Sequence, residues 1–502
     1  MTHRFLAGAA ATAALAYATL GAAGAAELRI GHSAMPNLGN PLCCTSNSQG
    51  YALQLAYDHM VYMDSEGAPQ PGLFSEWKNI NQTTWQVKLR PNVKFHNGKT
   101  LTADDIAGQL TYLLTDEGQA KAVAISRNVP ALATAKAIDA STIEITTKTP
   151  DVVFIQQLGS LKGMDWKHFA DVGYEGYATK PVGTGPYAPT NWQQDKIELV
   201  AFKEGWRPGK IDKVMMVALP ELAARVSAFA SNQIEVAMQI NADSKKAIET
   251  AGGKFFTAPA PSNLTMMFMS TRQGSPVADV RVRKALNMGI DRQRYLDGIV
   301  GEGVTVATSQ PAPKGVRGWQ ADIKPYPFDQ AAAKKLLTEA GIPNGLKIVA
   351  EAVVNTSEQA DIYQAVANDL SKMGVQMEIR SITLADLVSK ARALKPVDGE
   401  LVSFDMGAFP TIDMMRSINA LHSCKGTTKW TCFPDIEPTI TAANTEFDLK
   451  KRDEHLRKIA QYYHDMAPAL FLHEQFQLDA VSNKVKGWKP VNWVINWHDL
   501  TM

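Results

Sequence analysis

One stretch in the first quarter of the chain constrains the fold more than any other. Residues 83–106 read TTWQVKLRPNVKFHNGKTLTADDI. Trp85, Val87 and Leu89 alternate with polar side chains, which is the two-residue period of a half-buried strand. The pair Asn97-Gly98 favours a tight turn, because both residues tolerate a positive φ. The stretch therefore predicts a strand and a turn, in that order.

A capped helix is predicted to follow directly. Thr102 is a suitable N-cap, and Asp105 stands three residues later, where a capping box places its acid. Ile106, Leu110 and Leu113 then fall on one helical face. These local patterns predict a fragment of an α/β fold, but they do not indicate a function.

The same stretch resembles, nearly residue by residue, the signature of the extracellular solute-binding proteins of dipeptide, oligopeptide and nickel uptake systems. Other segments match the family in the same order: GTGPY at 183–187, the stretch 191–208 and DVRVRKALNMGIDR at 279–292. The resemblance covers about residues 27–490. Several motifs in one order are much more specific than any of them alone.

The resemblance implies an α/β, bilobal periplasmic-binding-protein fold with an extra inserted domain, which is the three-domain, cluster C type. The expected parts are domain I at 27–50, 183–264 and 481–502, an inserted domain II at 51–182, and domain III, the second lobe, at 265–480. The glycines of GTGPY would then mark the return from domain II. They do not fit a phosphate-binding loop, because neither a P-loop ending nor GxGxxG is present.

Patterns outside these motifs also favour mixed α/β domains. Helices are expected after Asp279 and Asp291, over 330–340 after the cap Asp329, and over 357–373, which passes into a strand at 375–379. A strand is expected over 142–146, and a late helix should end near Ala467, before Pro468. Strands and helices that alternate in this way are typical of α/β proteins.

The N-terminal segment predicts export. Residues 5–26 carry no charge, are rich in alanine, follow His3 and Arg4, and end in a run of small residues that a signal peptidase accepts. We expect residues 1–26 to be a signal peptide that is removed on the way to the periplasm. The alternative is a membrane anchor, because 22 residues can span a bilayer. No cysteine stands at the junction for a lipid anchor.

The charge balance disfavours a polyanionic partner. The chain has 51 Lys and Arg side chains against 50 Asp and Glu, and removal of the leader takes away only Arg4. A net charge near zero gives no basic face for nucleic acid, so none is expected as a partner.

Four cysteines divide into two sequence-local pairs, Cys43-Cys44 and Cys424 with Cys432. Because export leads to an oxidising compartment, we expect a disulfide between Cys424 and Cys432. Four cysteines still allow three pairings, and Cys43-Cys44 could form a vicinal disulfide, pair elsewhere or stay reduced. A metal site is the alternative for these thiols, but no histidine lies at ligand spacing from them.

The resemblance also points to ligand-binding residues. Thr45, Ser46 and Asn47 stand where the first loop contacts the ligand in the peptide binders, and the alternative is a solvated polar loop. In the second lobe, the segment 404–413 stands where dipeptide binders carry an aspartate that holds the peptide amine, since a buried ammonium needs an opposite charge. Asp405 and Asp413 are the acids that this segment retains.

This chain departs from the dipeptide binders at both ends of the ligand. Gly407 or one of its neighbours occupies the place of the aspartate that holds the peptide amine, and Asn355 stands near the position of the arginine that takes the peptide carboxylate. A free dipeptide would therefore lose both charge clamps. Phe404 and Phe409 are expected to form an apolar wall, with core packing as the alternative. Arg416 faces either an anionic ligand or the solvent, and we favour the solvent.

The resemblance implies a periplasmic substrate-binding protein of an ABC importer that has no enzymatic activity and no cofactor or metal. It would capture a small organic solute, which is peptide-like, opine-like or aromatic, by lobe closure. The protein, expected to be a monomer, would then deliver the solute to permease subunits at the inner membrane. The alternative is an exported hydrolase that acts on a small peptide or amide. It is disfavoured because no GxSxG, HExxH or Walker motif is present.

Overall fold

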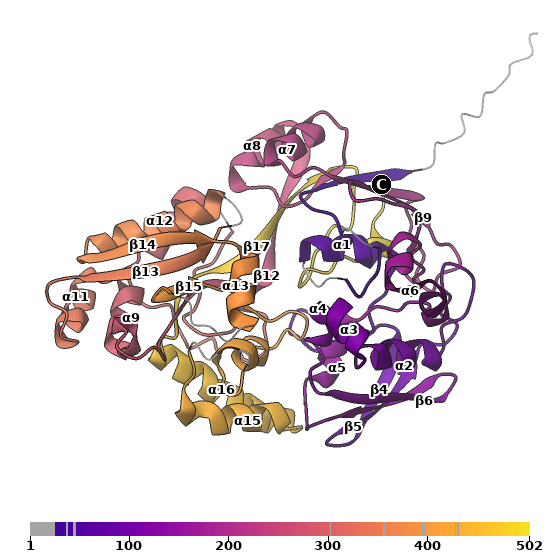
Figure 1. The fold of residues 1–502 in the computed structure, drawn as a ribbon. Coiled ribbons are helices and arrows are strands. Elements are labelled where there is room, and N and C mark those ends of the chain that lie inside the picture. The colour runs from indigo at the N-terminus through magenta and orange to yellow at the C-terminus, as the bar shows by residue number, and fades with distance from the viewer. Residues whose placement is uncertain are drawn as a thin grey trace, which may run out of the picture.

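Two lobes make up the protein, and one large sheet joins them (Figure 1). The computed structural model describes residues 26–36, 39–43, 47–301, 303–354, 357–392, 398–426, 428 and 431–502. We call the body built from residues 26–252 and 483–502 the N-terminal lobe, and the body built from residues 264–472 the second lobe. Each lobe has its own buried apolar core. Within the described ranges, no helix is long and apolar enough to cross a membrane.

The large sheet has eleven strands in the order β14-β13-β15-β12-β17-β11-β1-β10-β9-β8, with β16 beside β12. Its N-terminal-lobe strands are β1 (Glu27–His32), β8 (Tyr187–Trp192), β9 (Lys196–Ala201), β10 (Lys213–Ala218) and β11 (Val236–Ala237). Its second-lobe strands are β13 (Leu346–Val353), β14 (Val375–Ile382), β15 (Leu401–Ser403) and β16 (Met406–Gly407). The strands β12 (Gly253–Phe268) and β17 (Ala469–Ser482) run through both lobes.

The pairing of these two crossing strands breaks at the lobe boundary. β12 and β17 are antiparallel partners, but their register shifts between Pro259 and Asn263. Pro259 and Pro261 account for the break, because proline has no backbone N–H to donate to the ladder. The least regular part of the sheet therefore lies where the chain passes from one lobe to the other.

The strand, turn and helix predicted over 83–106 are confirmed. In β5 (Thr84–Leu89) the side chains of Trp85, Val87 and Leu89 are buried. Gly98 has a φ of 83°. The Thr102 backbone N–H donates to the Asp105 carboxylate at 2.9 Å just before α2 (Ala103–Tyr112). β5 belongs to a second sheet, β4-β5-β7-β6, with β4 (Phe74–Asn81), β6 (Leu132–Asp139) and β7 (Thr142–Thr147).

Most of the later helices also begin and end near their predicted positions. Asp279 caps α9 and Asp329 caps α11, while the helix after Asp291 is short and continues as a π-helical turn over Leu296–Val300. Ala467 ends α16 in the left-handed conformation, with φ of 44°. The second-lobe helices are α9 (Val280–Met288), α10 (Arg292–Tyr295), α11 (Gln330–Glu339), α12 (Ser357–Ser371), α13 (Leu384–Arg392), α14 (Met415–Ser417), α15 (Glu437–Thr445) and α16 (Leu449–Met466).

The GTGPY segment packs tightly against the end of the first helix. A Cβ on Gly183 would lie 2.1 Å from the Ala56 carbonyl oxygen, so only glycine allows this approach. The N-terminal lobe contains α1 (Asn47–Ala56), α3 (Asp116–Lys121), α4 (Val123–Ser126), α5 (Phe154–Gln157), α6 (Trp166–Thr179), α7 (Leu222–Ala230), α8 (Lys245–Thr250), and the short strands β2 (Val61–Met63) and β3 (Pro69–Pro71).

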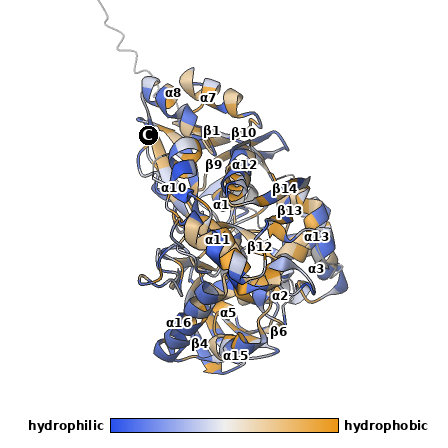
Figure 2. Ribbon diagram, turned by 90° about the vertical axis from the view of Figure 1, so that its left-hand side faces the viewer, coloured by the Kyte–Doolittle hydropathy of each residue, from blue (hydrophilic) through white to orange (hydrophobic). Residues whose placement is uncertain are grey.

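Hydropathy follows this arrangement. In Figure 2 the surface helix α16 is largely hydrophilic. The buried face of α16 includes Leu456, Ile459, Ala460 and Tyr463, as the helical periodicity predicts.

The expected limits of domains I, II and III stay predictions.

Candidate functional site

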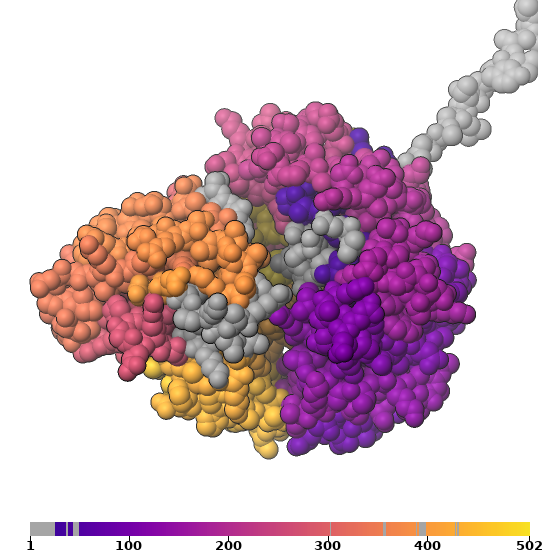
Figure 3. Space-filling model, in the orientation of Figure 1, coloured from indigo at the N-terminus to yellow at the C-terminus, as the bar shows by residue number. Residues whose placement is uncertain are grey.

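A hollow separates the two lobes on the face shown in Figure 3, and the yellow of the C-terminal strands is visible at its depth. The lobes also touch each other directly. The Val152 N–H donates to the Asn444 carbonyl at 3.1 Å, and Arg416 Nη2 donates to Asn128 Oδ1 at 3.3 Å. A solute in the hollow would therefore meet side chains from both lobes.

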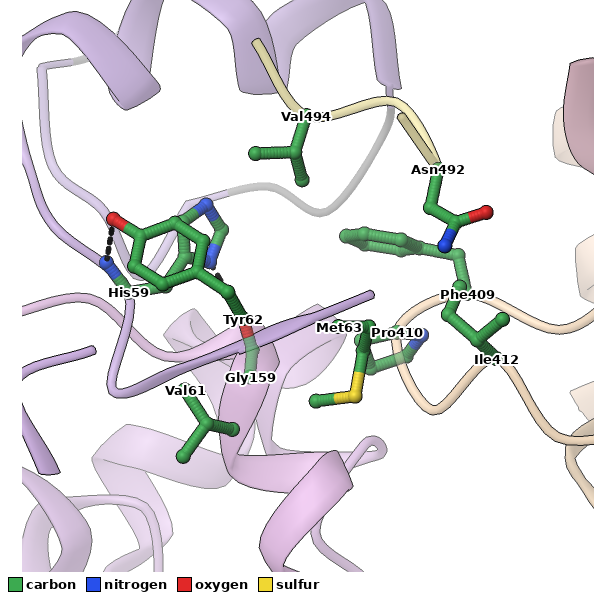
Figure 4. A pocket seen from close by; sticks show the side chains of 10 residues that line it. All are labelled: His59, Val61, Tyr62, Met63, Gly159, Phe409, Pro410, Ile412, Asn492 and Val494. Carbon is green, nitrogen blue, oxygen red and sulfur yellow. Dashed lines mark hydrogen bonds between the residues drawn. The ribbon is translucent and has the colours of Figure 1, made fainter. Parts of the chain in front are cut away.

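A small cavity, shown in Figure 4, lies where the lobes meet. Its volume is about 20 Å³, which is room for one water molecule. Phe409 of the second lobe points into it and packs edge-to-face on Trp493, with ring centroids 5.9 Å apart. The cavity is lined by His59, Val61, Tyr62, Met63, Gly159, Phe409, Pro410, Ile412, Asn492 and Val494.

The imidazole of His59 is neutral in this cavity. Burial, together with the neighbouring Lys162 ammonium, lowers the pKa of His59 to about 3. Its Nδ1 lies 2.7 Å from the Gly159 carbonyl oxygen and donates to it, so Nε2 is the acceptor. Among the described residues, that Nε2 has no hydrogen-bond partner. The neutral His59 therefore places no charge on the side of the cavity that Phe409 faces.

Asp405 is a shielded carboxylate beside the crossing strands. It lies between β15 and β16, and the next residue, Met406, pairs with Asn263 at the break in β12. Its Oδ2 accepts a hydrogen bond from Gln475 Nε2 at 2.8 Å. Burial raises the pKa of Asp405 to about 6. A carboxylate with a neutral amide as its partner is suited to a ligand ammonium or hydroxyl.

The other acid of the segment, Asp413, has a structural role. Its Oδ2 lies 2.6 Å from Arg452 Nη1, and both side chains are almost fully buried. Its Oδ1 accepts from the Met415 N–H at 3.0 Å. Because these bonds occupy both oxygens, we leave Asp413 out of the proposed site.

Phe404 and Phe409, like the two acids, divide into one residue that packs inside the second lobe and one that lies between the lobes. Phe404 packs with Met267, Val353 and Leu421 in a cluster of its own lobe, which agrees with core packing. Phe409 lines the cavity between the lobes.

The expectation that Arg416 faces the solvent is wrong. Its side chain is part-buried and reaches Asn128 of the opposite lobe.

Several predicted site residues lie outside the described part of the chain. Thr45, Ser46 and Asn355 are not described, and of Asn47 only the backbone, at the start of α1, is. Glu351, near Asn355 in sequence, forms an ion pair with Lys390 at 2.9 Å.

The predicted disulfide between Cys424 and Cys432 is confirmed. Cys43 is also disulfide-bonded. Within the described ranges, no cluster of His, Cys, Asp or Glu is arranged to hold a metal ion.

Periodicity and motifs did not reveal several residues at the lobe interface. His59, Tyr62, Trp493 and Asn128 come from loops and short elements that are far apart in sequence. Side chains on such loops carry no period of 2 or 3.6, so a pattern search has no signal to find. The turn around Asn492 and Trp493, which both have positive φ, is the feature that could have drawn attention.

Comparison with known proteins agrees with this architecture. The dipeptide-binding protein of Escherichia coli K12 is 26% identical over 462 residues, which are 83% of each chain. The glutathione-binding protein GsiB of the same strain is 26% identical over 309 residues, which are 60% of this chain and 58% of that protein.

Solved structures share the fold at lower identity. The Helicobacter pylori periplasmic binding protein DppA, in complex with the peptide STSA, has a TM-score of 0.78 and 20% identity, with 95% of this chain and 98% of that chain covered. AgaA from A. tumefaciens R10, in complex with agropinic acid, has a TM-score of 0.76 and 20% identity, with 93% and 96% covered.

The model of the bacterial extracellular solute-binding proteins, family 5 Middle, matches residues 68–426. This match spans well over half of the chain, and the relatives named above are binding proteins rather than enzymes. The chain therefore belongs to family 5 of the bacterial extracellular solute-binding proteins, the solute-capturing components of ABC importers.

Proposed function

We propose that this protein captures one small organic solute between its lobes in the periplasm and passes it unchanged to the permease of an ABC importer. One observation carries the proposal: two lobes with separate cores are joined by strands whose pairing breaks at the boundary, and both lobes line one cavity (Figure 4). A ligand that contacts both lobes binds the closed form more tightly and so shifts the population toward it.

The solute class we favour is opine-like, aromatic or a peptide derivative. Phe409 and Trp493 supply an aromatic wall, and Asp405 supplies a shielded carboxylate for an amine or hydroxyl. An unmodified dipeptide suits the chain less well, because the arginine for its carboxylate is replaced near Asn355. Thr45, Ser46, Asn47 and Asn355 stay proposed ligand contacts.

A defined panel of solutes tests the proposal. The purified protein is mixed with the peptide STSA, agropinic acid, glutathione and dialanine, and its melting temperature and the recovered solute are measured. We expect one of the first three to raise the melting temperature and to be recovered unaltered. Conversion of a solute to product would instead support the hydrolase, and equal stabilisation by dialanine would contradict the solute class.

Two substitutions test the wall and the carboxylate. Phe409→Ala removes the edge-to-face contact with Trp493 that holds the lobes together, worth about 1 kcal/mol, as well as the proposed contact with the ligand, so ligand affinity should fall roughly fivefold or more. The matched control is Phe328→Ala, because Phe328 is an exposed phenylalanine of the same lobe. Asp405→Asn should weaken a ligand that carries an ammonium. If both site variants bind like the wild type, Phe409 and Asp405 are not ligand contacts.

We also propose that the exported chain begins at Ala26 or Glu27, after removal of the leader, and that it is a monomer. The charged strand β1 (Glu27–His32) starts at this point, as expected for a mature N-terminus. Mass spectrometry of the protein recovered from the periplasm gives its first residue. An intact leader on the exported protein would contradict cleavage, and a dimer in light scattering would contradict the monomer.

A further inference from the structure

Arg416, an arginine without a counter-charge among the described residues, lies between the lobes. Arg416 on α14 is part-buried, and its hydrogen-bond partner across the interface is the neutral amide of Asn128, at 3.3 Å. Its Nε is buried and has no hydrogen-bond partner among the described residues. Burial lowers the pKa of Arg416, and no acid in the described part of the chain opposes this shift. The guanidinium is therefore desolvated but not neutralised.

Other shielded arginines of the protein are satisfied by their surroundings. Arg283 donates to the backbone carbonyls of Val277 and Met466, at 2.9 and 2.7 Å. Arg452 pairs with Asp413, and Arg207 pairs with Asp58. Each of these side chains thus has a carboxylate or several carbonyl acceptors, as a shielded cation requires, although Arg452 Nη2 has no hydrogen-bond partner among the described residues. Arg416 differs because, among the described residues, its guanidinium has neither a carboxylate nor a backbone carbonyl as acceptor and bonds the Asn128 amide instead.

The position of Arg416 connects it with the cleft. Ser417 Oγ donates to the Gly407 carbonyl at 2.7 Å, which ties α14 to β16. β16 pairs with β12 at Ser262, where the pairing of the crossing strands is interrupted. On the other side, Asn128 follows α4, which lies on the face of the N-terminal lobe that looks toward the second lobe (Figure 1). The guanidinium therefore bridges the two lobes and lies on a segment tied to the interrupted strand pairing.

We propose that Arg416 binds a carboxylate of the captured solute, so that the solute is an anionic or zwitterionic acid. A guanidinium presents two parallel N–H groups that match a carboxylate, and within the described ranges the Arg416 guanidinium makes one long bond, to an amide. A guanidinium shut between the two lobes is cut off from bulk water, and an opposite charge on the ligand offsets that cost. This inference rests on the proposed function, because it assigns the solute class of the same cleft.

The test compares acids with their neutral counterparts. A library of small acids, including glutathione and agropinic acid, is assayed by thermal shift and calorimetry beside the carboxamide of each compound, with inorganic phosphate as a further arm. We expect wild-type protein to bind one acid, and its carboxamide at least tenfold more weakly. In Arg416→Gln, the affinity for that acid should fall at least tenfold to the level of the carboxamide, and Arg416→Lys should recover part of it.

The control variant is Arg457→Gln, which removes an exposed arginine of the same lobe that pairs with Asp322 at 3.1 Å. It should bind the acid like wild type. Unliganded Arg416→Gln should melt no lower than wild type, since an uncompensated cation is lost, whereas a merely structural arginine would lower the melting temperature.

Three outcomes would overturn the assignment: equal binding of acid and carboxamide, full affinity in Arg416→Gln, or capture of a neutral solute in native mass spectrometry. If the protein binds inorganic phosphate through Arg416 but binds no carboxylic acid, the proposed carboxylate is wrong and the group that Arg416 recognises is a phosphate. Binding of no solute by any variant, including capture from a metabolite extract, would count against the proposed function itself. Failure of the arginine role and failure of the function are thereby separate results.

Discussion

At the scale of single residues, the acids of one short segment have different roles although they look alike in sequence. Asp405 has a neutral amide partner beside the crossing strands, whereas Asp413 is fully buried against Arg452. A buried ion pair contributes little when both partners are present, but losing one partner leaves a charge in a medium that does not solvate it. The surroundings of each carboxylate therefore decide its role.

Asp413→Asn should destabilise the unliganded protein. The variant leaves Arg452 without a counter-charge, so the free energy of unfolding should fall by about 3–5 kcal/mol in urea denaturation. Asp453→Asn, which removes an exposed partner of Arg317 at 2.9 Å, is the control and should cost less than about 1 kcal/mol. A stable Asp413→Asn protein that has lost only its ligand affinity would place Asp413 in the site instead.

At the scale of secondary-structure elements, local chemistry accounts for where α2 begins. The Thr102 hydroxyl and backbone N–H both donate to Asp105 Oδ2, at 2.8 and 2.9 Å. Thr102→Ala should therefore lower the free energy of unfolding by about 1 kcal/mol, as measured by denaturation. Thr111→Ala, at an exposed position of the same helix, should change it by less than half as much. Equal effects would mean that the cap contributes nothing.

The Cys424–Cys432 disulfide closes a loop beside α14 and α15, with a sequence separation of eight residues. In the chain-entropy model, a loop of this size stabilises the folded state by about 2–3 kcal/mol. The double variant Cys424→Ser, Cys432→Ser should therefore unfold at a lower urea concentration than wild type. Serine variants are preferable to a reducing agent, because Cys43 is disulfide-bonded as well. An unchanged midpoint would contradict the stabilising role.

At the scale of the whole molecule, lobe closure brings acids and bases together across the interface. Asp151 of the N-terminal lobe lies near Asp413 and Arg452 of the second lobe, while Gln157 Nε2 and the Val153 N–H donate to it from its own lobe. Burial raises the pKa of Asp151 from 3.8 to about 6, Asp413 adds to this shift, and Arg452 opposes it. The ionised form is therefore disfavoured when the lobes are together.

This shift predicts a pH dependence of closure. If Asp151 has its ordinary pKa in the open form, closure of the lobes takes up a proton at this carboxylate. The contribution of Asp151 to closure is therefore favourable at low pH and is lost as the pH rises through about 6. Ligand affinity and the closed fraction in X-ray scattering should fall several-fold between pH 5 and pH 7. Asp151→Asn should flatten this dependence, while the exposed-site control Asp195→Asn should keep it. A wild-type profile without this fall would show that Asp151 does not sense closure.

The sequence by itself determined the local elements of this protein and its family. Alternating residues such as Trp85 and Val87, the cap at Thr102 and the capped helices of the second lobe act over a few residues, where short-range sterics and burial decide the structure. The order of the family motifs was equally readable, because it is a property of the chain alone.

Only the tertiary structure decided which side chains meet between the lobes. Phe409 faces Trp493 and Arg416 faces Asn128 across the interface, because segments that are remote in sequence are brought together in space. Within the second lobe, the same kind of remote contact encloses Asp413 against Arg452. Such contacts depend on chain topology and on the removal of water from both partners, and no spacing in the sequence encodes either.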